Sequence, residues 1–283
     1  MSDAQFGIST HLFHDALLTR DHLVHIAAHG FDCVELVATR SHFDYRSDEA
    51  IRELAEWLSD TRLNLHSVHA PVVEAMRGRT PVGWFSNASG DETRRMAALD
   101  EAKAALAIAR SIPFDFLVVH LGVPATAQAG PGDNQRNAAH RSAEALVEAA
   151  ADAGVRVAFE LIQNPLSSAD ALVRLLEDDL DGLNASICLD YGHGHLTGDL
   201  ADVIETLSGY LGTTHLHDND GRRDTHLPPY AGTIDWDAAM METQKIGYDG
   251  AYIFELAPTA DPVPVLVKAA RARERLEQTF VTF

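Results

Sequence analysis

Cysteine is nearly absent from this 283-residue chain, and no long hydrophobic run occurs. Its two cysteines, Cys33 and Cys188, lie within apolar runs, as small buried residues do, and not in a pattern typical of a disulfide. No segment approaches the roughly 18 apolar residues of a membrane span, and the first residues lack the basic and then apolar pattern of an export signal. We therefore expect a soluble, cytoplasmic protein without a membrane partner.

Positive charge is also scarce, because 22 Lys and Arg stand against 42 Asp and Glu, a formal net charge of −20. No Lys/Arg cluster forms a local basic track, so a polyanion would be repelled. Nucleic acid is disfavoured as a partner, and a small neutral or weakly charged substrate is favoured. If the substrate is phosphorylated, Arg40, Arg77 and Arg79 are candidate contacts. A homo-oligomer stays open.

Glycine-rich phosphate loops are missing too, which argues against a doubly wound open sheet. What recurs is a short apolar run rich in Val, Ile and Phe, then a polar loop, then a segment with helical spacing. The expected strands are 5–9, 32–37, 63–69, 115–120, 155–161, 185–190, 212–217 and 251–256. The expected helices are 15–29, 47–60, 91–110, 134–153, 167–178, 199–209, 236–246 and 262–278. Eight such units predict an α/β fold, a single (β/α)8 TIM barrel over residues 1–283, with its active site at the C-terminal strand ends.

Local signals place several boundaries. Ser47 and Asp91 are expected to begin helices, and Gly30, Gly154 and Gly247 stand where helices should stop. Residues 70–90 are expected to form a long loop over the mouth of the barrel.

Strands two to eight each end in a metal-ligand or proton-transfer residue. These are Glu35, His69, His120, Glu160, Asp190, His217 and Glu255. One such residue alone is usually a hydrogen-bonded structural group, but all seven would converge at one end of a barrel. Glu160 and Glu255 are flanked by apolar residues, so burying them would be costly without a cation or a donor.

The stretch 215–236 is the densest polar segment of the chain. After a short apolar run it holds His217, Asp218, Asp220, Arg223, Asp224 and His226. Convergent carboxylates and imidazoles are the donors that divalent cations need, whereas the alternative is a solvated acidic loop. Together with the strand ends, this stretch predicts a metal site.

On these motifs the sequence resembles the xylose isomerase-like TIM barrels, which include sugar isomerases and epimerases, inosose dehydratases and the endonuclease IV group. The resemblance covers most of the chain. It rests on His69 in VHAP, His120 in VVHLG, Glu160 in FEL, Asp190 and His193 in LDYGHGH, His217, Asp224 and His226 in the polar stretch, and Glu255 in FEL.

Resemblance to the sugar branch implies one divalent ion, usually manganese, cobalt or magnesium, bound by Glu160, Asp190, His217 and Glu255. It implies that Glu160 and Glu255 are the acid and base, which move a proton through a metal-stabilised enediolate of a keto-sugar or sugar phosphate. The expected substrate contacts are His69, His120, His193, Arg223 and Glu35. Leu166 stands where ketose 3-epimerases carry a further Glu, which puts that subtype in doubt.

Three alternatives stay open. A dehydratase of a keto-sugar or inosose would use the same site. The endonuclease IV branch would bind three zinc ions, with His69, His120, His193, Asp224 and His226 as additional ligands, although Ala-Pro-Val follows His69 where those enzymes carry a Tyr that enters DNA. A non-catalytic metal- or sugar-binding barrel would lack one of the paired glutamates, and both are present. The favoured function is a metal-dependent isomerase or epimerase acting on a small carbohydrate.

Overall fold

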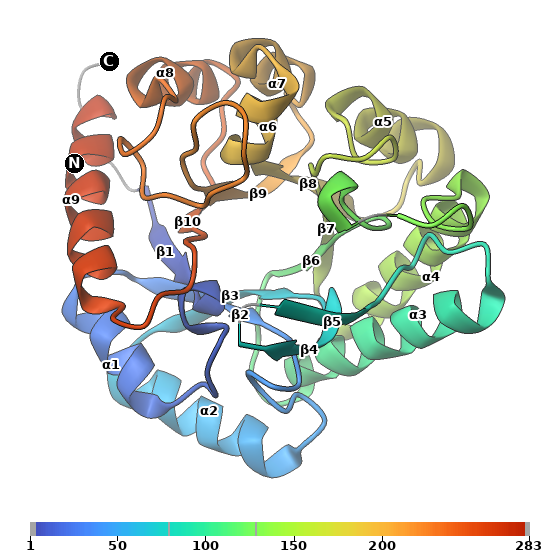
Figure 1. Cartoon of the computed structure of the whole chain (residues 1–283), viewed down its shortest axis with the longest axis horizontal. Helices are drawn as coiled ribbons and strands as arrows, with labels where there is room; N and C mark the ends of the chain where they lie inside the picture. Colours follow the sequence, from blue (N-terminus) through green and yellow to red (C-terminus); the bar gives the residue numbers. More distant parts are fainter. Residues whose placement is uncertain (1–3, 79, 128, 281–283) are drawn as a thin grey trace.

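The computed structural model describes residues 4–78, 80–127 and 129–280, and eight of its strands close into a parallel barrel (Figure 1). In order around the barrel they are β1 (Phe6–Ser9), β2 (Cys33–Val37), β3 (Asn64–His69), β6 (Phe116–Val119), β7 (Arg156–Glu160), β8 (Ala185–Asp190), β9 (Leu211–Leu216) and β10 (Tyr252–Phe254). Phe6 of β1 pairs with Tyr252 of β10, which closes the ring. The predicted TIM barrel is confirmed.

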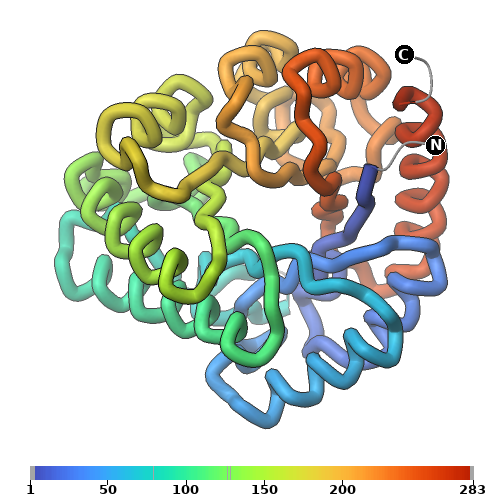
Figure 2. The backbone as a smooth tube through the Cα atoms, turned by 180° about the vertical axis from the view of Figure 1, so that it is seen from behind, coloured from blue at the N-terminus to red at the C-terminus, as the bar shows by residue number. Residues whose placement is uncertain are grey.

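Helices surround the barrel on its outer side, and the view from behind shows the same ring (Figure 2). They are α1 (Arg20–Ala28), α2 (Asp48–Thr61), α3 (Glu92–Leu106), α4 (Arg136–Ala153), α5 (Ala169–Arg174), α6 (Tyr191–Thr197), α7 (Leu200–Thr206), α8 (Trp236–Lys245) and α9 (Val263–Thr279). Shorter turns are η1 (Thr10–Phe13), η2 (Ala107–Arg110), η3 (Ala125–Ala127) and η4 (Leu175–Asp179). Within the described ranges, no helix is both long and apolar enough to cross a bilayer.

The expected helix boundaries hold where a capping residue marks them. The Ser47 side chain accepts a hydrogen bond from Ala50 N at the start of α2, and Asp91 accepts from Thr93 N at the start of α3. Helix α4 ends at Gly154, whose φ of 71° is in the left-handed region that favours glycine.

Two expectations about elements were wrong, and one helix was missed. Helix α1 begins at Arg20 and not at 15, because Thr19 forms the capping box with His22. Residues 70–90 are not only loop, since β4 (Val73–Arg77) and β5 (Thr80–Trp84) pair as an antiparallel hairpin. Helix α6 was not predicted.

The interior of the barrel is apolar at one level and polar above it. Small residues pack inside, including Cys33 against Ile253 and Cys188 against Val118 and Ala158. Both cysteines are free and buried, as expected.

His42 is a buried histidine beside the mouth of the barrel. Its Nδ1–H donates to Ala16 O at 2.7 Å, while its Nε2 has no partner among the described residues. Burial outweighs that hydrogen bond and lowers the pKa of His42 to about 4. The side chain is therefore neutral at neutral pH.

We expect His42 to make the protein less stable in acid. The pKa of His42 is lower in the folded state than in the unfolded chain. Below about pH 6.5, His42 is therefore protonated in the unfolded state but still neutral in the folded state. Lowering the pH from about 7.5 to 5.5 should cost roughly 1.4 kcal/mol through this residue, and His42→Gln should lose that part of the dependence. Urea unfolding at both pH values measures it. The exposed His25→Gln is the control, and equal acid losses in the two variants would contradict the assignment.

Candidate metal centre

Three groups of ligand-type side chains lie at the C-terminal mouth of the barrel. Within each group, one ligand atom from every residue lies within 4.8 Å of the others. The central group is Glu160, Asp190, His215 and Glu255; the His69 group is His69, His120 and Glu160; the His226 group is His193, His217, Asp224 and His226. Glu160 joins the central group to the His69 group, and His217 Nε2, 2.9 Å from Asp190 Oδ1, joins the His226 group to the central group.

The central group gathers three carboxylates around one imidazole nitrogen. His215 Nδ1 lies 3.2 Å from Glu160 Oε1, 3.7 Å from Glu255 Oε2 and 4.0 Å from Asp190 Oδ2. None of these three carboxylates is more than 5% exposed. Buried carboxylates this close repel one another unless a cation lies between them, and three oxygens with one nitrogen suit manganese, magnesium, cobalt or zinc.

His215 was not predicted. Thr213 and His215 of β9, and His217 directly after it, alternate onto the inner face of the barrel, and the register pairs Asp190 with His215. The prediction chose His217 as the last residue of the expected strand 212–217, but the ligand of the central group is His215, two residues earlier. The His-x-His alternation was the signal that could have identified His215.

Glu35 lies behind His215 and not against the cavity. It is inside β2, fully buried, and its Oε2 accepts hydrogen bonds from His215 Nε2 at 2.9 Å and from Ser67 Oγ at 2.8 Å. Burial opposes ionisation, but His215 outweighs it and lowers the pKa of Glu35 to about 2. This contact orients the His215 ring, as an outer carboxylate does for a metal-bound histidine.

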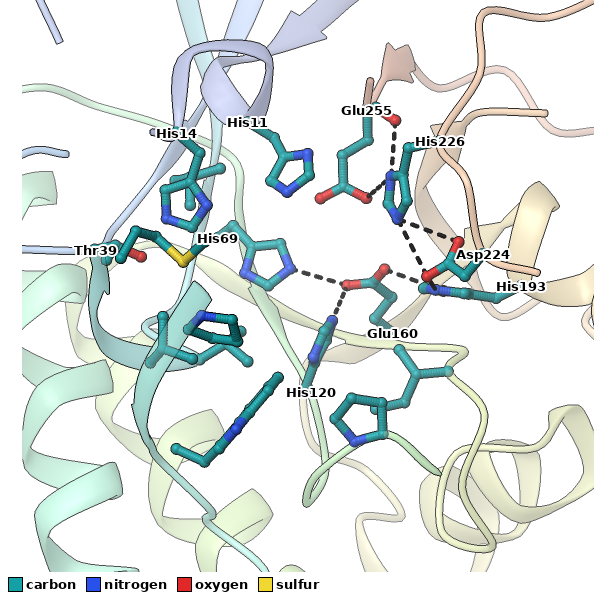
Figure 3. A pocket seen from close by; sticks show the side chains of 18 residues that line it. His11, His14, Thr39, His69, His120, Glu160, His193, Asp224, His226 and Glu255 are labelled. Atoms are coloured by element: carbon teal, nitrogen blue, oxygen red, sulfur yellow. Dashed lines mark hydrogen bonds and ion pairs between the residues drawn. The ribbon is translucent and has the colours of Figure 1, made fainter. Parts of the chain in front are cut away.

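The His69 group points two imidazoles at one oxygen (Figure 3). Glu160 Oε2 lies 3.0 Å from His69 Nε2 and 2.8 Å from His120 Nε2. His69 Nδ1 lies 3.0 Å from Ala70 O, to which it donates. Since the carbonyl fixes the Nδ1–H form, Nε2 is the atom available to a metal.

The His226 group repeats that arrangement twice. His193 Nδ1 donates to Leu161 O at 3.1 Å and His226 Nδ1 to Glu255 O at 3.0 Å. Their Nε2 atoms lie 3.2 and 3.3 Å from Asp224 Oδ2. Three histidines of the cluster therefore hold Nδ1 on a backbone carbonyl and aim Nε2 at a carboxylate, which is the orientation that metal ligation requires.

His217 is packed between its neighbours. Its Nε2 lies 2.9 Å from Asp190 Oδ1, and its ring stacks on His226 with centroids 3.8 Å apart. A Cβ on Gly192 would lie 2.0 Å from His217 Cε1, so only glycine fits there. Gly192 is in α6, whose start is fixed by Asp190, which accepts a hydrogen bond from His193 N at 2.7 Å.

The loop that carries Asp224 and His226 is held by a buried carboxylate. Asp218 accepts hydrogen bonds from Gly232 N, Ile234 N and Trp236 Nε1 at 2.9–3.1 Å. Asp218 is therefore a structural residue of the polar stretch. His226 has a φ of 44°, an uncommon value for a non-glycine residue and one often found at functional sites.

A cavity of about 250 Å³ opens above the cluster (Figure 3). The predicted residues that line it are His69, His120, Glu160, His193, Asp224, His226 and Glu255, while Asp190 and His217 lie beneath it. Three predicted arginines are exposed and lie outside the lining: Arg223, which pairs with Asp220 at 3.0 Å, Arg77 and Arg40. Arg79 lies outside the described residues.

The profile of the xylose isomerase-like TIM barrels matches residues 23–277. The chain belongs to this family. Uncharacterized protein MJ1311 of Methanocaldococcus jannaschii is 27% identical over 268 residues, covering 92% of this chain and 86% of that protein. The crystal structure of a D-tagatose 3-epimerase-like protein is similar with a TM-score of 0.78 at 24% identity, covering 98% of this chain and 97% of that one. The IOLI protein, solved with a bound zinc atom, is similar with a TM-score of 0.78 at 16% identity, covering 99% and 100%.

Family membership confirms the resemblance read from the motifs, and the two solved structures, below 25% identity, bear on the fold alone. Within this family fold, the clustered donor atoms are the feature that fits a metal. Two further ring nitrogens agree with this fit. Nδ1 of His120 and Nδ1 of His217 are buried and have no hydrogen-bond partner among the described residues.

Charge balance in the metal-free cluster comes from the imidazoles. Burial favours their neutral forms, but Glu160 raises the pKa of His69 to about 9, Asp190 raises that of His193 to about 10, and Asp224 raises that of His226 to about 9. These histidines are protonated at neutral pH, whereas a metal ligand must present a lone pair.

We therefore expect metal binding to release protons. Near neutral pH, each protonated histidine that becomes a ligand must lose a proton that the neighbouring carboxylates stabilise. This includes His215 of the central group, whose pKa is raised well above its usual value against the effect of burial. Calorimetric titration of chelated protein with Mn²⁺ or Zn²⁺, in two buffers of different ionisation enthalpy, should show about one proton or more released per ion, and weaker affinity as the pH falls. Binding that is independent of the buffer would contradict this charge balance.

Proposed function

We propose that the protein is a metal-dependent isomerase or epimerase of keto-sugars that works by proton transfer. The observation that carries the proposal is the position of Glu160 and Glu255. Both line the cavity, both are buried, and their carboxylates point toward one another in the central group (Figure 3). The D-tagatose 3-epimerase-like neighbour gives further support.

The proposed ligands of the ion are Glu160, Asp190, His215 and Glu255, with His215 in place of the predicted His217. A divalent ion there would polarise the substrate carbonyl and stabilise the negative charge of the enediolate. His215 is oriented by Glu35 from behind, and Asp190 is held by the first turn of α6.

Glu160 and Glu255 would move the proton. Burial opposes the ionisation of both, but His120 and His215 outweigh it at Glu160, and His215 and His226 at Glu255, so both pKa values are lowered and both groups start as carboxylates. One carboxylate removes the proton next to the carbonyl and becomes a carboxylic acid, which can return that proton to the adjacent carbon. The other can add a proton from the opposite face only after it takes one from a protonated histidine beside it, His69 at 3.0 Å from Glu160 Oε2 or His226 at 3.5 Å from Glu255 Oε2. The carbon that receives the proton decides between epimerisation and isomerisation. The dehydratase alternative begins with the same proton removal.

A zinc phosphodiesterase is the second candidate, because the three ligand groups adjoin one another and together could hold several ions. Such ions could activate water and neutralise a phosphodiester. The net charge of −20 and the small cavity favour the sugar reaction. Hydrolysis of bis(p-nitrophenyl) phosphate by zinc-loaded protein that exchanges no sugar proton would favour this candidate.

We expect Glu160→Gln and Glu255→Gln each to lower the rate of proton exchange by about 1,000-fold or more, because an amide cannot take the proton. Deuterium uptake from D₂O into ketoses and ketose phosphates, followed by NMR with manganese-loaded protein, measures it. Bound metal is quantified in parallel, because both residues are also proposed ligands. Glu53→Gln, on the exposed face of α2, is the matched control. Retained exchange in either variant with metal bound would overturn the acid and base roles.

A further inference from the structure

The cavity is lined by ligand-type residues on its floor and by apolar or neutral residues on its sides. Its floor carries the metal-type ligands, including Glu160, Asp224 and Glu255. One side rises through the apolar residues of the β4–β5 hairpin, and another through His14, which follows η1, and Thr39, which follows β2. The part of a substrate that points away from the metal must meet these two sides.

No Lys or Arg is among the described residues that line this cavity. The side lined by His14 and Thr39 carries no positive charge either, because burial holds the pKa of His14 far below its usual range. The charged groups on the floor are three carboxylates and the protonated His69, His193 and His226, whose Nε2 atoms are already paired with Glu160 or Asp224. A phosphate ester placed against either side would lose its hydration without gaining a cationic partner, a large cost for a buried anion.

The hairpin offers a continuous apolar surface. Met76 and Pro81 pair across β4 and β5, and Trp84 at the end of β5 pairs with Val73; all four line the cavity. The hairpin lies across one side of the barrel mouth (Figure 1) and is anchored there by a hydrogen bond from Met76 N to Ser41 Oγ at 2.9 Å. Indole and thioether groups pack well against C–H surfaces and give hydroxyls few partners.

We propose that the site takes an uncharged, unphosphorylated keto-sugar whose end remote from the carbonyl is apolar, and that this end packs against Met76, Pro81 and Trp84. This inference rests on the proposed function. His14 and Thr39, which also line the cavity, meet the remaining hydroxyls. The cavity of about 250 Å³ is below the usual range for drug-sized ligands, as expected for a single sugar ring or chain.

A series that differs only at C6 tests the proposal. The probes are the D-ketohexoses, their 6-deoxy analogues and their 6-phosphates, each followed for deuterium exchange with manganese-loaded protein. We expect the deoxy sugar to match or exceed the parent sugar in kcat/KM, and the phosphate to be at least about 100-fold poorer. A phosphate that reacts as well as its parent sugar would overturn this inference and leave the proposed function intact. If no sugar of any arm exchanges, the proposed function fails.

Trp84→Ala tests the role of the hairpin. It should raise KM for the deoxy sugar by about tenfold with a smaller change in kcat, because the lost contact binds substrate before and during the reaction alike. Trp57→Ala, in a half-buried position on α2, is the matched control and should leave KM unchanged. Unchanged KM in Trp84→Ala would remove the hairpin from the substrate site.

Discussion

The structure depends on how it accommodates buried negative charge. Glu35, Glu160, Asp190 and Glu255 are each at most 5% exposed, within one barrel and close to one histidine. Isolated carboxylates at that depth would be protonated or would destabilise the fold. The six histidines of the three groups, His215 among them, point ring nitrogens at carboxylate oxygens and so keep the carboxylates ionised in the absence of a cation. The site therefore concentrates buried negative charge, which a bound divalent metal ion would offset.

Much of this could be read from sequence because the fold is repetitive. Eight apolar runs followed by helical segments predict the barrel, and a barrel brings its strand ends together whatever the loops do. Which residue of each strand reaches the height of the proposed ligands was harder to predict. The strands of a barrel are staggered, so the last polar residue is not at the same height on each. His215 was missed for that reason. Asp218 resembles a ligand by composition, but its oxygens are taken by backbone and indole donors, which only tertiary structure reveals. Gly78 and Pro81 made the β4–β5 hairpin resemble a loop.

The floor of the cavity carries the proposed metal ligands, whereas its sides are the surfaces that a substrate would contact. The floor is made by residues at the ends of barrel strands and by α6, whose positions follow from register and capping. The sides come from a hairpin and a turn that are not part of the barrel ring, so their side chains can vary without disturbing the ligands. In this chain those sides are apolar or neutral. This division explains how one family fold can keep its chemistry while changing what it binds.

The central claim is that the buried cluster is a metal centre. Metal content per chain of the purified, unchelated protein, measured by plasma mass spectrometry with manganese, cobalt, magnesium and zinc all followed, tests it most directly. The account predicts about one equivalent or more of divalent metal, which chelation removes and dialysis against the same metal restores. About one equivalent of manganese, cobalt or magnesium would agree with the sugar reaction, and three of zinc with the phosphodiesterase. Protein that purifies without metal and takes up none would contradict the account.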